Sequence, residues 1–137
     1  MKRSFAVSAL IGTMVLVLTF AAVAGPCLAD EASAVPQVPV KGMVTMVDLG
    51  ATGCIPCMIM SHVVDSLQKK YQGRAAIYFI DIRKYPKEGP KFGVNVIPTQ
   101  IFYNTDGKEV YRHEGVMLEG AVTAKLESLG VKQTTGS

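Results

Sequence analysis

Apolar residues recur along the chain at two different spacings, and these spacings predict its secondary structure. Residues 43–49 and 75–82 are mostly apolar and rich in β-branched side chains, which predicts two buried strands. Between them, apolar side chains from position 56 to 71 recur three or four residues apart, as in an amphipathic helix. Two strands joined by one helix predict a right-handed βαβ unit.

The second half of the chain predicts two further strands. Residues 84–93 are polar, with one short helical turn, and strand-like runs follow at 99–104 and 108–113. Asp106-Gly107 lies between these runs and is a strong hairpin signal, so the two strands should be antiparallel.

A closing helix is predicted over residues 118–129. Its apolar face would carry Leu118, Val122, Leu126 and Leu129. The order βαβ, then ββα, predicts an α/β fold with a four-stranded mixed sheet flanked by helices on both faces. The predicted domain spans residues 43–130, with a linker or arm at 30–42 and a flexible tail at 131–137.

Residues 1–29 have the pattern of an export signal. A basic start precedes an uncharged apolar stretch from residue 5 to 24, and small residues lead to a cleavage site after Ala29 or Ala24. The stretch is also long enough to span a bilayer, so an uncleaved anchor is an alternative. Lipid attachment at Cys27 is a third alternative. This processing requires a small residue immediately before the cysteine, and Pro26 stands there instead. All three predict a periplasmic or otherwise extracytoplasmic body.

The charge balance gives no sign of a nucleic-acid partner. The whole chain has a net charge of +3, and the residues after position 29 carry 12 basic and 11 acidic side chains. A nearly neutral body does not favour a polyanionic ligand. We expect a monomer that binds other proteins.

Cys54-Ile55-Pro56-Cys57 lies where the first strand gives way to the first helix. Pro56 suits the first helical turn, so both sulfurs should lie at a helix N-terminus. The unpaired N–H groups and the helix dipole there favour a thiolate over a thiol. A thiolate can attack a disulfide, and a cysteine three residues further on can resolve the mixed disulfide. The pattern predicts a redox site.

Other uses of the two cysteines are less favoured. A zinc site needs four ligands, and the other candidates, Cys27, His62 and His113, do not have zinc-finger spacing. Met58 occupies the position at which a haem-attachment motif has histidine. Soft sulfur ligands bind copper(I), so Met58 and Met60 leave a metal-binding module as an alternative. A structural disulfide and an adaptor without turnover are the remaining alternatives, and no metal is assigned.

The region from Met43 to Leu129 resembles the thioredoxin family. Besides the cysteine motif, the resemblance is carried by Val47-Asp48, Pro90-Lys91-Phe92-Gly93-Val94, Ile97-Pro98-Thr99, Asp106-Gly107 and Gly115. It implies a thioredoxin-like fold and a thiol–disulfide oxidoreductase that needs no cofactor beyond its redox-active disulfide.

The resemblance also implies roles for individual residues. Cys54 would be the nucleophile, Cys57 the resolving thiol, and Asp48 the proton acceptor for Cys57, with a pKa raised by burial. Pro98 would follow a cis peptide bond and present the backbone of Ile97 to an extended substrate. The implied substrate-binding residues are Ile97, Pro98, Gly53, Ile55, Pro56 and Val116.

Four positions depart from the family pattern. Gly53 replaces a tryptophan, and Ile55 replaces the glycine of the usual cysteine motif. Met58 stands where a lysine is common. Phe79 replaces a buried lysine, which leaves Asp48 without that partner. We therefore expect a more open, less apolar rim and a different environment for Asp48.

The resulting functional expectation is an exported reductant. Pro56 and Ile97 match the residues at these positions in reducing thioredoxins. The alternative function is that of a disulfide oxidant. The chain has no flavin or nicotinamide motif, so electrons should come from a membrane thiol-reducing partner and pass to exported protein disulfides.

Overall fold

The computed structural model describes residues 35–133 of the chain. The predicted export segment at 1–29, Cys27, the start of the arm and the last four residues lie outside this range. Within residues 35–133, none of the helices has the length and apolar character needed to cross a membrane.

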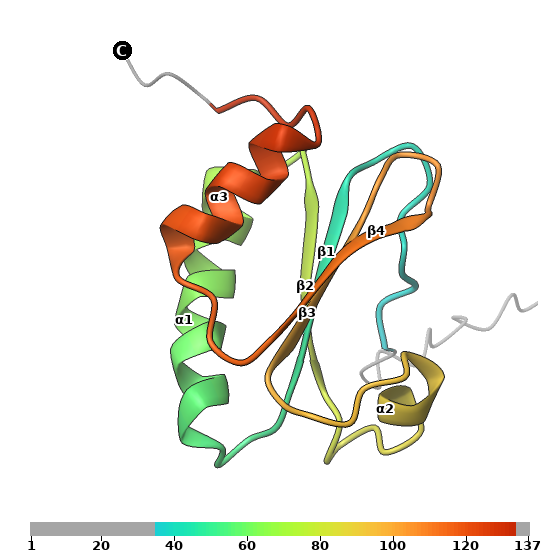
Figure 1. Ribbon diagram of the computed structural model, residues 1–137, viewed down its shortest axis with the longest axis vertical. Coiled ribbons are helices and arrows are strands. Elements are labelled where there is room, and N and C mark those ends of the chain that lie inside the picture. Colours follow the sequence, from blue (N-terminus) through green and yellow to red (C-terminus); the bar gives the residue numbers. More distant parts are fainter. Residues whose placement is uncertain (1–34, 134–137) are drawn as a thin grey trace, which may run out of the picture. The chain divides into compact units, whose positions relative to one another are not determined.

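Within residues 35–133, four strands form one mixed sheet. They are β1 (Thr45–Gly50), β2 (Ala76–Asp81), β3 (Thr99–Tyr103) and β4 (Glu109–Glu114). Their order in the sheet is β2-β1-β3-β4 (Figure 1). β1 runs parallel to β2 and antiparallel to β3, and β3 pairs antiparallel with β4. The predicted mixed four-stranded sheet is confirmed.

In the described part of the chain, three helices accompany the sheet: α1 (Ile55–Lys70), α2 (Glu88–Lys91) and α3 (Glu119–Ser128). α1 and α3 lie side by side on one face, and the short α2 lies on the other side (Figure 1). α1 follows β1 at once because Pro56 in its first turn fits the start of a helix.

Alternate side chains of the strands supply two separate apolar cores. Toward α1 and α3, strand residues such as Met46 and Phe102 pack with helix residues such as Met60 and Leu126. The opposite core is built on Val47, Leu49, Ile80, Ile101 and Tyr103. Val35, Val38, Phe92 and Val94 pack against it, so the second face is covered by the arm and the α2 segment rather than by a long helix.

Two details of the predicted boundaries are wrong. Leu118 is 72% exposed, because its backbone is extended and the helix begins one residue later. Val131 belongs to the segment predicted as a flexible tail, but it is buried and its N–H donates to the carbonyl of Leu126 at 3.1 Å.

Candidate active site

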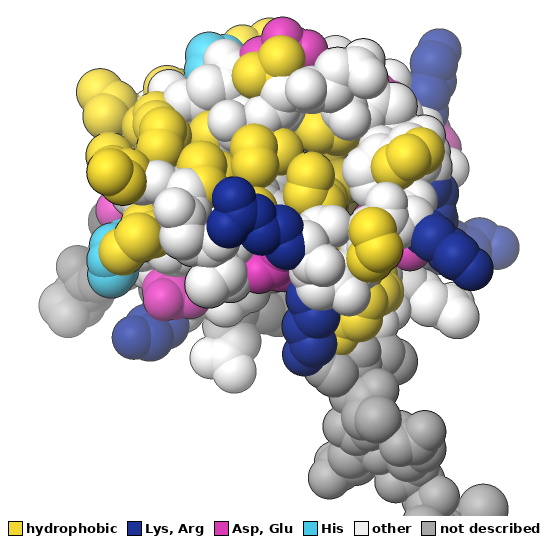
Figure 2. All heavy atoms as spheres, turned by 90° about the horizontal axis from the view of Figure 1, so that it is seen from below, with side chains coloured by type: hydrophobic (Ala, Val, Ile, Leu, Met, Phe, Trp, Pro, Cys, Tyr) yellow, Lys and Arg dark blue, Asp and Glu magenta, His cyan; other side chains and the backbone are white. Residues whose placement is uncertain are grey.

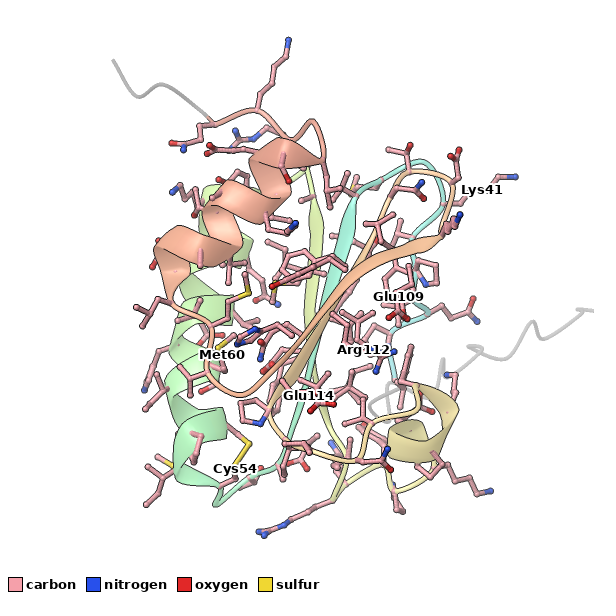
Figure 3. The ribbon with its side chains drawn as sticks, in the orientation of Figure 1. Lys41, Cys54, Met60, Glu109, Arg112 and Glu114 are labelled. Carbon is pink, nitrogen blue, oxygen red and sulfur yellow. A yellow bond between two sulfur atoms is a disulfide. The ribbon has the colours of Figure 1, made fainter. Side chains whose placement is uncertain are left out.

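The two cysteines of the motif form a disulfide at the start of α1 (Figure 3). Their Cα atoms are 5.2 Å apart. Cys54 is the N-cap residue and is partly exposed, whereas Cys57 is 1% exposed. Among the described residues no side chain caps the helix, and its first turn has no acidic residue, so the N-terminal N–H groups remain available to a sulfur anion.

A polar clamp holds the loop that leads into Cys54. The N–H of Thr52 donates to Oδ2 of Asp81 at 3.0 Å, and the Thr52 hydroxyl donates to the same oxygen. Arg83 completes the clamp, since its Nη1 donates to the carbonyl of Thr52 at 2.7 Å and its backbone N–H donates to Oδ1 of Asp81 at 2.8 Å. The segment after β2 therefore fixes the loop before α1.

The clamp also affects the charge state of Asp81. Desolvation by burial acts to raise the pKa of this carboxyl, but hydrogen bonds from Thr52, Arg83 and Lys84 outweigh it and lower the pKa below 3.8. The carboxylate is therefore ionised at neutral pH and can accept all of these bonds.

Gly53 lies between the clamp and the first cysteine. Its φ of +82° is in the left-handed region that favours glycine. Nη1 of Arg83 lies 3.3 Å from where a Cβ at residue 53 would stand. A cation thus borders the position at which the family resemblance expects a tryptophan, which makes this part of the rim less apolar.

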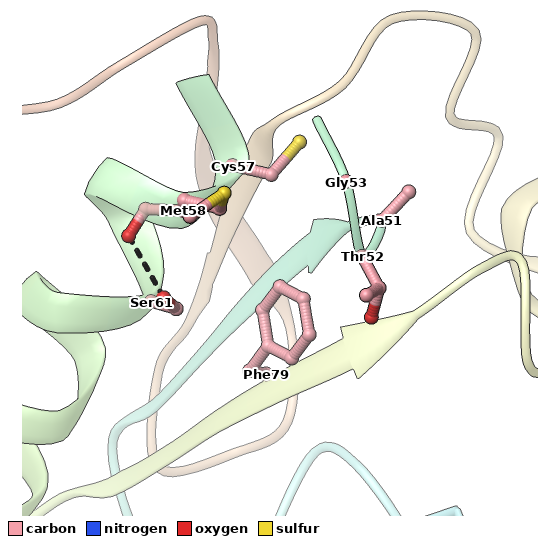
Figure 4. A pocket seen from close by; sticks show the side chains of 7 residues that line it. All are labelled: Ala51, Thr52, Gly53, Cys57, Met58, Ser61 and Phe79. Carbon is pink, nitrogen blue, oxygen red and sulfur yellow. Dashed lines mark hydrogen bonds between the residues drawn. The ribbon is translucent and has the colours of Figure 1, made fainter. Parts of the chain in front are cut away.

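A cleft of about 260 Å³ opens beside Cys57 (Figure 4). Its lining residues are Ala51, Thr52, Gly53, Cys57, Met58, Ser61 and Phe79. The ring of Phe79 lies so close to Gly50 that a Cβ there would approach its Cε2 to 2.7 Å. The same Cβ would lie 3.1 Å from the Cβ of Cys57, so ring, strand and buried cysteine are in close contact.

Asp48 is fully buried two residues before Gly50 on β1. Because strand side chains alternate, Asp48 shares the face of Met46, which packs toward α1. Burial raises its pKa from 3.8 to about 6, although a hydrogen bond from Gln100 acts to lower it. Nε2 of Gln100 donates to Oδ1 of Asp48 at 2.8 Å.

Sequence reasoning missed Gln100 as the partner of Asp48. The signal for it was a lone amide in the apolar strand 99–103, but its partner depends on the register between β1 and β3. That register places Gln100 directly opposite Asp48.

The segment before β3 lies at the same end of the sheet as the disulfide. The Ile97–Pro98 peptide bond is cis. Pro98 is buried, and its carbonyl accepts the N–H of Gly115 at 2.8 Å. Val116 is half-buried and packs against the core beneath α1 and α3. The hairpin β3–β4 therefore ties the proline to the segment that carries Val116.

Exposed apolar side chains gather at this end of the molecule (Figure 2). Ile55 is 76% exposed and Met58 is 53% exposed. Ile59, Val96 and Leu118 are also exposed large hydrophobic residues. Apolar surface of this kind next to a reactive group suits contact with another protein.

The second methionine of the copper alternative lies in the core. Met60 is fully buried, and its sulfur accepts the N–H of Met117 at 3.3 Å. Within residues 35–133, no three or more His, Cys, Asp or Glu side chains are grouped as metal ligands.

The sheet order and a disulfide at the start of the helix after β1 define a thioredoxin-like domain. The Thioredoxin family model matches residues 33–128, and the chain belongs to the thioredoxin family. It is 34% identical over 89 residues to thioredoxin Y2 of Arabidopsis thaliana chloroplasts, covering 64% of this chain and 53% of that protein. It is 30% identical over 84 residues to thioredoxin 2 of Chlorobaculum tepidum, covering 61% and 76% of the two chains.

Solved structures share the fold. A malarial protein matches with a TM-score of 0.59 and 25% identity, over 65% of this chain and 99% of that one. The crystal structure of chloroplastic thioredoxin z matches with a TM-score of 0.59 and 19% identity, over 66% and 81%. At this identity the second match supports the fold alone.

Proposed function

We propose that the chain is a thiol–disulfide oxidoreductase that reduces disulfides of exported proteins through Cys54 and Cys57. The observation that carries this proposal is the unequal exposure of two bonded sulfurs at one helix N-terminus. Cys54 is accessible to a substrate, whereas Cys57 is buried directly behind it. The redox centre is this disulfide, and no other cofactor is needed.

The reaction runs in two exchanges. In the reduced protein, the Cys54 thiolate attacks a substrate disulfide, and one substrate thiolate leaves with its electron pair. Cys57 then loses its proton, attacks the sulfur of Cys54 and restores the Cys54–Cys57 bond. The second substrate thiolate leaves, and two electrons have passed from the dithiol to the substrate. Asp48 is suited to accept the Cys57 proton because its pKa of about 6 allows it to gain and lose one near neutral pH.

Substrate would bind along the rim of the disulfide. The backbone of Ile97, held by the buried Pro98, can pair with an extended segment. Gly53, Ile55, Pro56 and Val116 supply neighbouring surface, and the Ile55 side chain is 76% exposed. The exposed apolar side chains at this end of the molecule favour contact with flexible protein segments.

The direction we assign is reduction. Pro56 between the cysteines and Ile97 before the cis-proline are the residues of reducing thioredoxins, as the resemblance in sequence implies. The export signal predicted at residues 1–29 supports action outside the cytoplasmic membrane. Electrons would come from a membrane thiol-reducing partner.

Mixed-disulfide trapping tests the roles of the two cysteines. Cys57→Ser should accumulate a covalent complex with a disulfide substrate such as insulin, because the resolving thiol is missing. Cys54→Ser should trap far less, since Cys57 is buried. Equal trapping by both variants would contradict the assigned roles.

Reduction of insulin in dithiothreitol, run beside metal analysis of the reduced protein, separates the alternatives. The proposal predicts turnover without bound metal. Stoichiometric copper or zinc without turnover would favour a metal-binding module. The absence of both turnover and bound metal would favour an adaptor.

A further inference from the structure

Asp48 and Gln100 form an isolated polar pair inside the apolar core. They are direct cross-strand partners on β1 and β3, and both side chains are fully buried. One hydrogen bond joins them, from Nε2 of Gln100 to Oδ1 of Asp48, at 2.8 Å. The other two oxygens, Oδ2 of Asp48 and Oε1 of Gln100, have no hydrogen-bond partner among the described residues.

These two oxygens are both acceptors when Asp48 is ionised. Buried acceptors without a donor are costly. The ionised pair has two such acceptors and lacks a hydrogen atom that could join them. A proton on Asp48 would supply it, because a carboxylic acid can donate from one oxygen while its other oxygen accepts. The amide of Gln100 has the complementary groups, a donor already in use and an acceptor without a partner.

The surroundings offer few other charges to this pair. From β2 the cross-strand neighbour of Asp48 is Phe79, and from β4 the neighbour of Gln100 is His113. The buried side chains of α1 include one titratable group, Cys57, and those of α3 include none. His113 is half-buried, and its Nε2 lies 3.4 Å from the carbonyl of Val116. Titratable side chains on the elements around the pair thus include Cys57 at the start of α1, His113 and Tyr111 on β4, and Asp81 at the end of β2.

We propose that Gln100 is the positioning residue for proton transfer from Cys57 to Asp48. Through Nε2 it holds the carboxylate, and through Oε1 it accepts a hydrogen bond from the protonated carboxyl. The inference rests on the proposed oxidoreductase function and deepens it. The family resemblance expects a buried lysine as the partner of Asp48. The neutral amide of Gln100 is the partner in this chain, and it adds no charge to the core.

The proton and electron balance is simple. The Asp48 carboxylate takes the proton of the Cys57 thiol, and the resulting thiolate attacks the sulfur of Cys54 in the mixed disulfide. The Cys54–Cys57 bond forms, the bond to the substrate breaks, and the substrate sulfur leaves with the electron pair. Asp48 afterwards returns its proton to solvent, and Gln100 keeps the carboxylate in place.

Gln100→Met tests the proposal, because methionine has a similar length and neither of the two polar atoms. The substitution removes Nε2, whose bond favours the charged carboxylate, and also Oε1, which favours the protonated acid. The bond to the charged carboxylate is the stronger of the two, so its loss should prevail and raise the pKa of Asp48. We expect the pH midpoint for resolution of the mixed disulfide to move up by about one unit. In an Asp48→Asn background the same substitution should leave the pH profile unchanged.

Gln68→Met is the matched control. Gln68 also donates from its amide, to the carbonyl of Ile77 at 2.9 Å, but it is an exposed residue of α1. Its pH profile should match that of the unaltered protein. An unshifted midpoint in Gln100→Met, or an equal shift in the Asp48→Asn background, would overturn the proposal.

A measurement on the unaltered protein keeps the test independent of folding of the variant. The side-chain amide resonances of Gln100 should titrate with the same midpoint as the carboxyl of Asp48, and separate midpoints would overturn the proposal. If the unaltered protein exchanges no disulfide at all, the proposed function fails, whereas exchange with no dependence on Gln100 defeats this inference alone.

Discussion

Phe79 takes the space that any side chain at residue 50 would need. A Cβ on Gly50 would lie 2.7 Å from Cε2 and 3.3 Å from Cζ of the Phe79 ring. The glycine and the ring are therefore a matched pair beside Cys57, and the pair fills the region where the family resemblance expects a buried lysine.

Gly50→Ala should destabilise the protein. The ring of Phe79 would have to shift in a packed site, and such overpacking costs about 1–3 kcal/mol. Denaturant unfolding measures the loss, and adding Phe79→Leu should recover part of it. Gly120→Ala is the control, because a Cβ at that helical position meets nothing within 4 Å. It should be neutral or stabilising by up to about 1 kcal/mol. Equal losses in both variants would contradict the matched pair.

The polar clamp makes a prediction about the loop before Cys54. Arg83→Ala removes the bond to the carbonyl of Thr52, and Asp81→Asn weakens the bond that protects the Thr52 N–H. We expect faster hydrogen exchange at residues 52–54 in both variants, with Lys132→Ala as an exposed control. Unchanged exchange would mean that the loop holds its shape without the clamp.

The buried carboxyl of Asp48 predicts a pH-dependent gain on substitution. Its pKa in the folded protein is about 6, against an ordinary value of 3.8, so the folded state binds the proton more tightly than the unfolded state. Stability contributed by this group is therefore present below about pH 4, is lost as the pH rises to about 6, and remains absent above it.

Asp48→Asn should thus stabilise the oxidised protein at pH 7.5 by roughly 2–3 kcal/mol, at about 1.36 kcal/mol per pKa unit. The new amide can also donate to Oε1 of Gln100. Near pH 4 the gain from removing the charge should disappear. Unfolding curves at the two pH values measure the gain in the free energy of unfolding. An equal gain at both pH values would show that the pKa of Asp48 is not raised.

The arrangement of strands and helices could be predicted because it rests on short-range signals. The apolar runs, the Pro56 helix start and the Asp106-Gly107 turn each act locally, and together they select one topology. Leu118 misled the prediction because helical spacing cannot tell the last extended residue from the first helical one.

The sequence predicts the cysteine motif from its spacing, and the family resemblance adds the buried Asp48 and the cis bond before Pro98. The spacing of Cys54 and Cys57 identifies them as a redox pair, but three other features of the site depend on tertiary contacts. Gln100 meets Asp48 through strand register, Arg83 reaches the loop from the segment after β2, and Phe79 fits against Gly50 through packing. No local pattern carries this information.

Ile55 sets the cysteine motif apart from that of the reducing members of the family. An apolar side chain next to Cys54 can desolvate the thiol and raise its pKa, but the Ile55 side chain is 76% exposed, so this effect should be small. Ile55→Gly should therefore lower the pKa of Cys54 only modestly, whereas Ile55→His, by adding a polar and ionisable ring, should lower it further. Thiolate absorbance titrations of the three proteins measure this. A large fall with glycine would show that Ile55 does desolvate the sulfur.

The reduction potential of the Cys54–Cys57 pair tests the central claim most directly. Equilibration of the purified protein with glutathione or dithiothreitol buffers gives this number. A reductant should have a potential near the value of about −270 mV found for thioredoxin. A potential near about −120 mV, typical of a strong disulfide oxidant, would contradict the account.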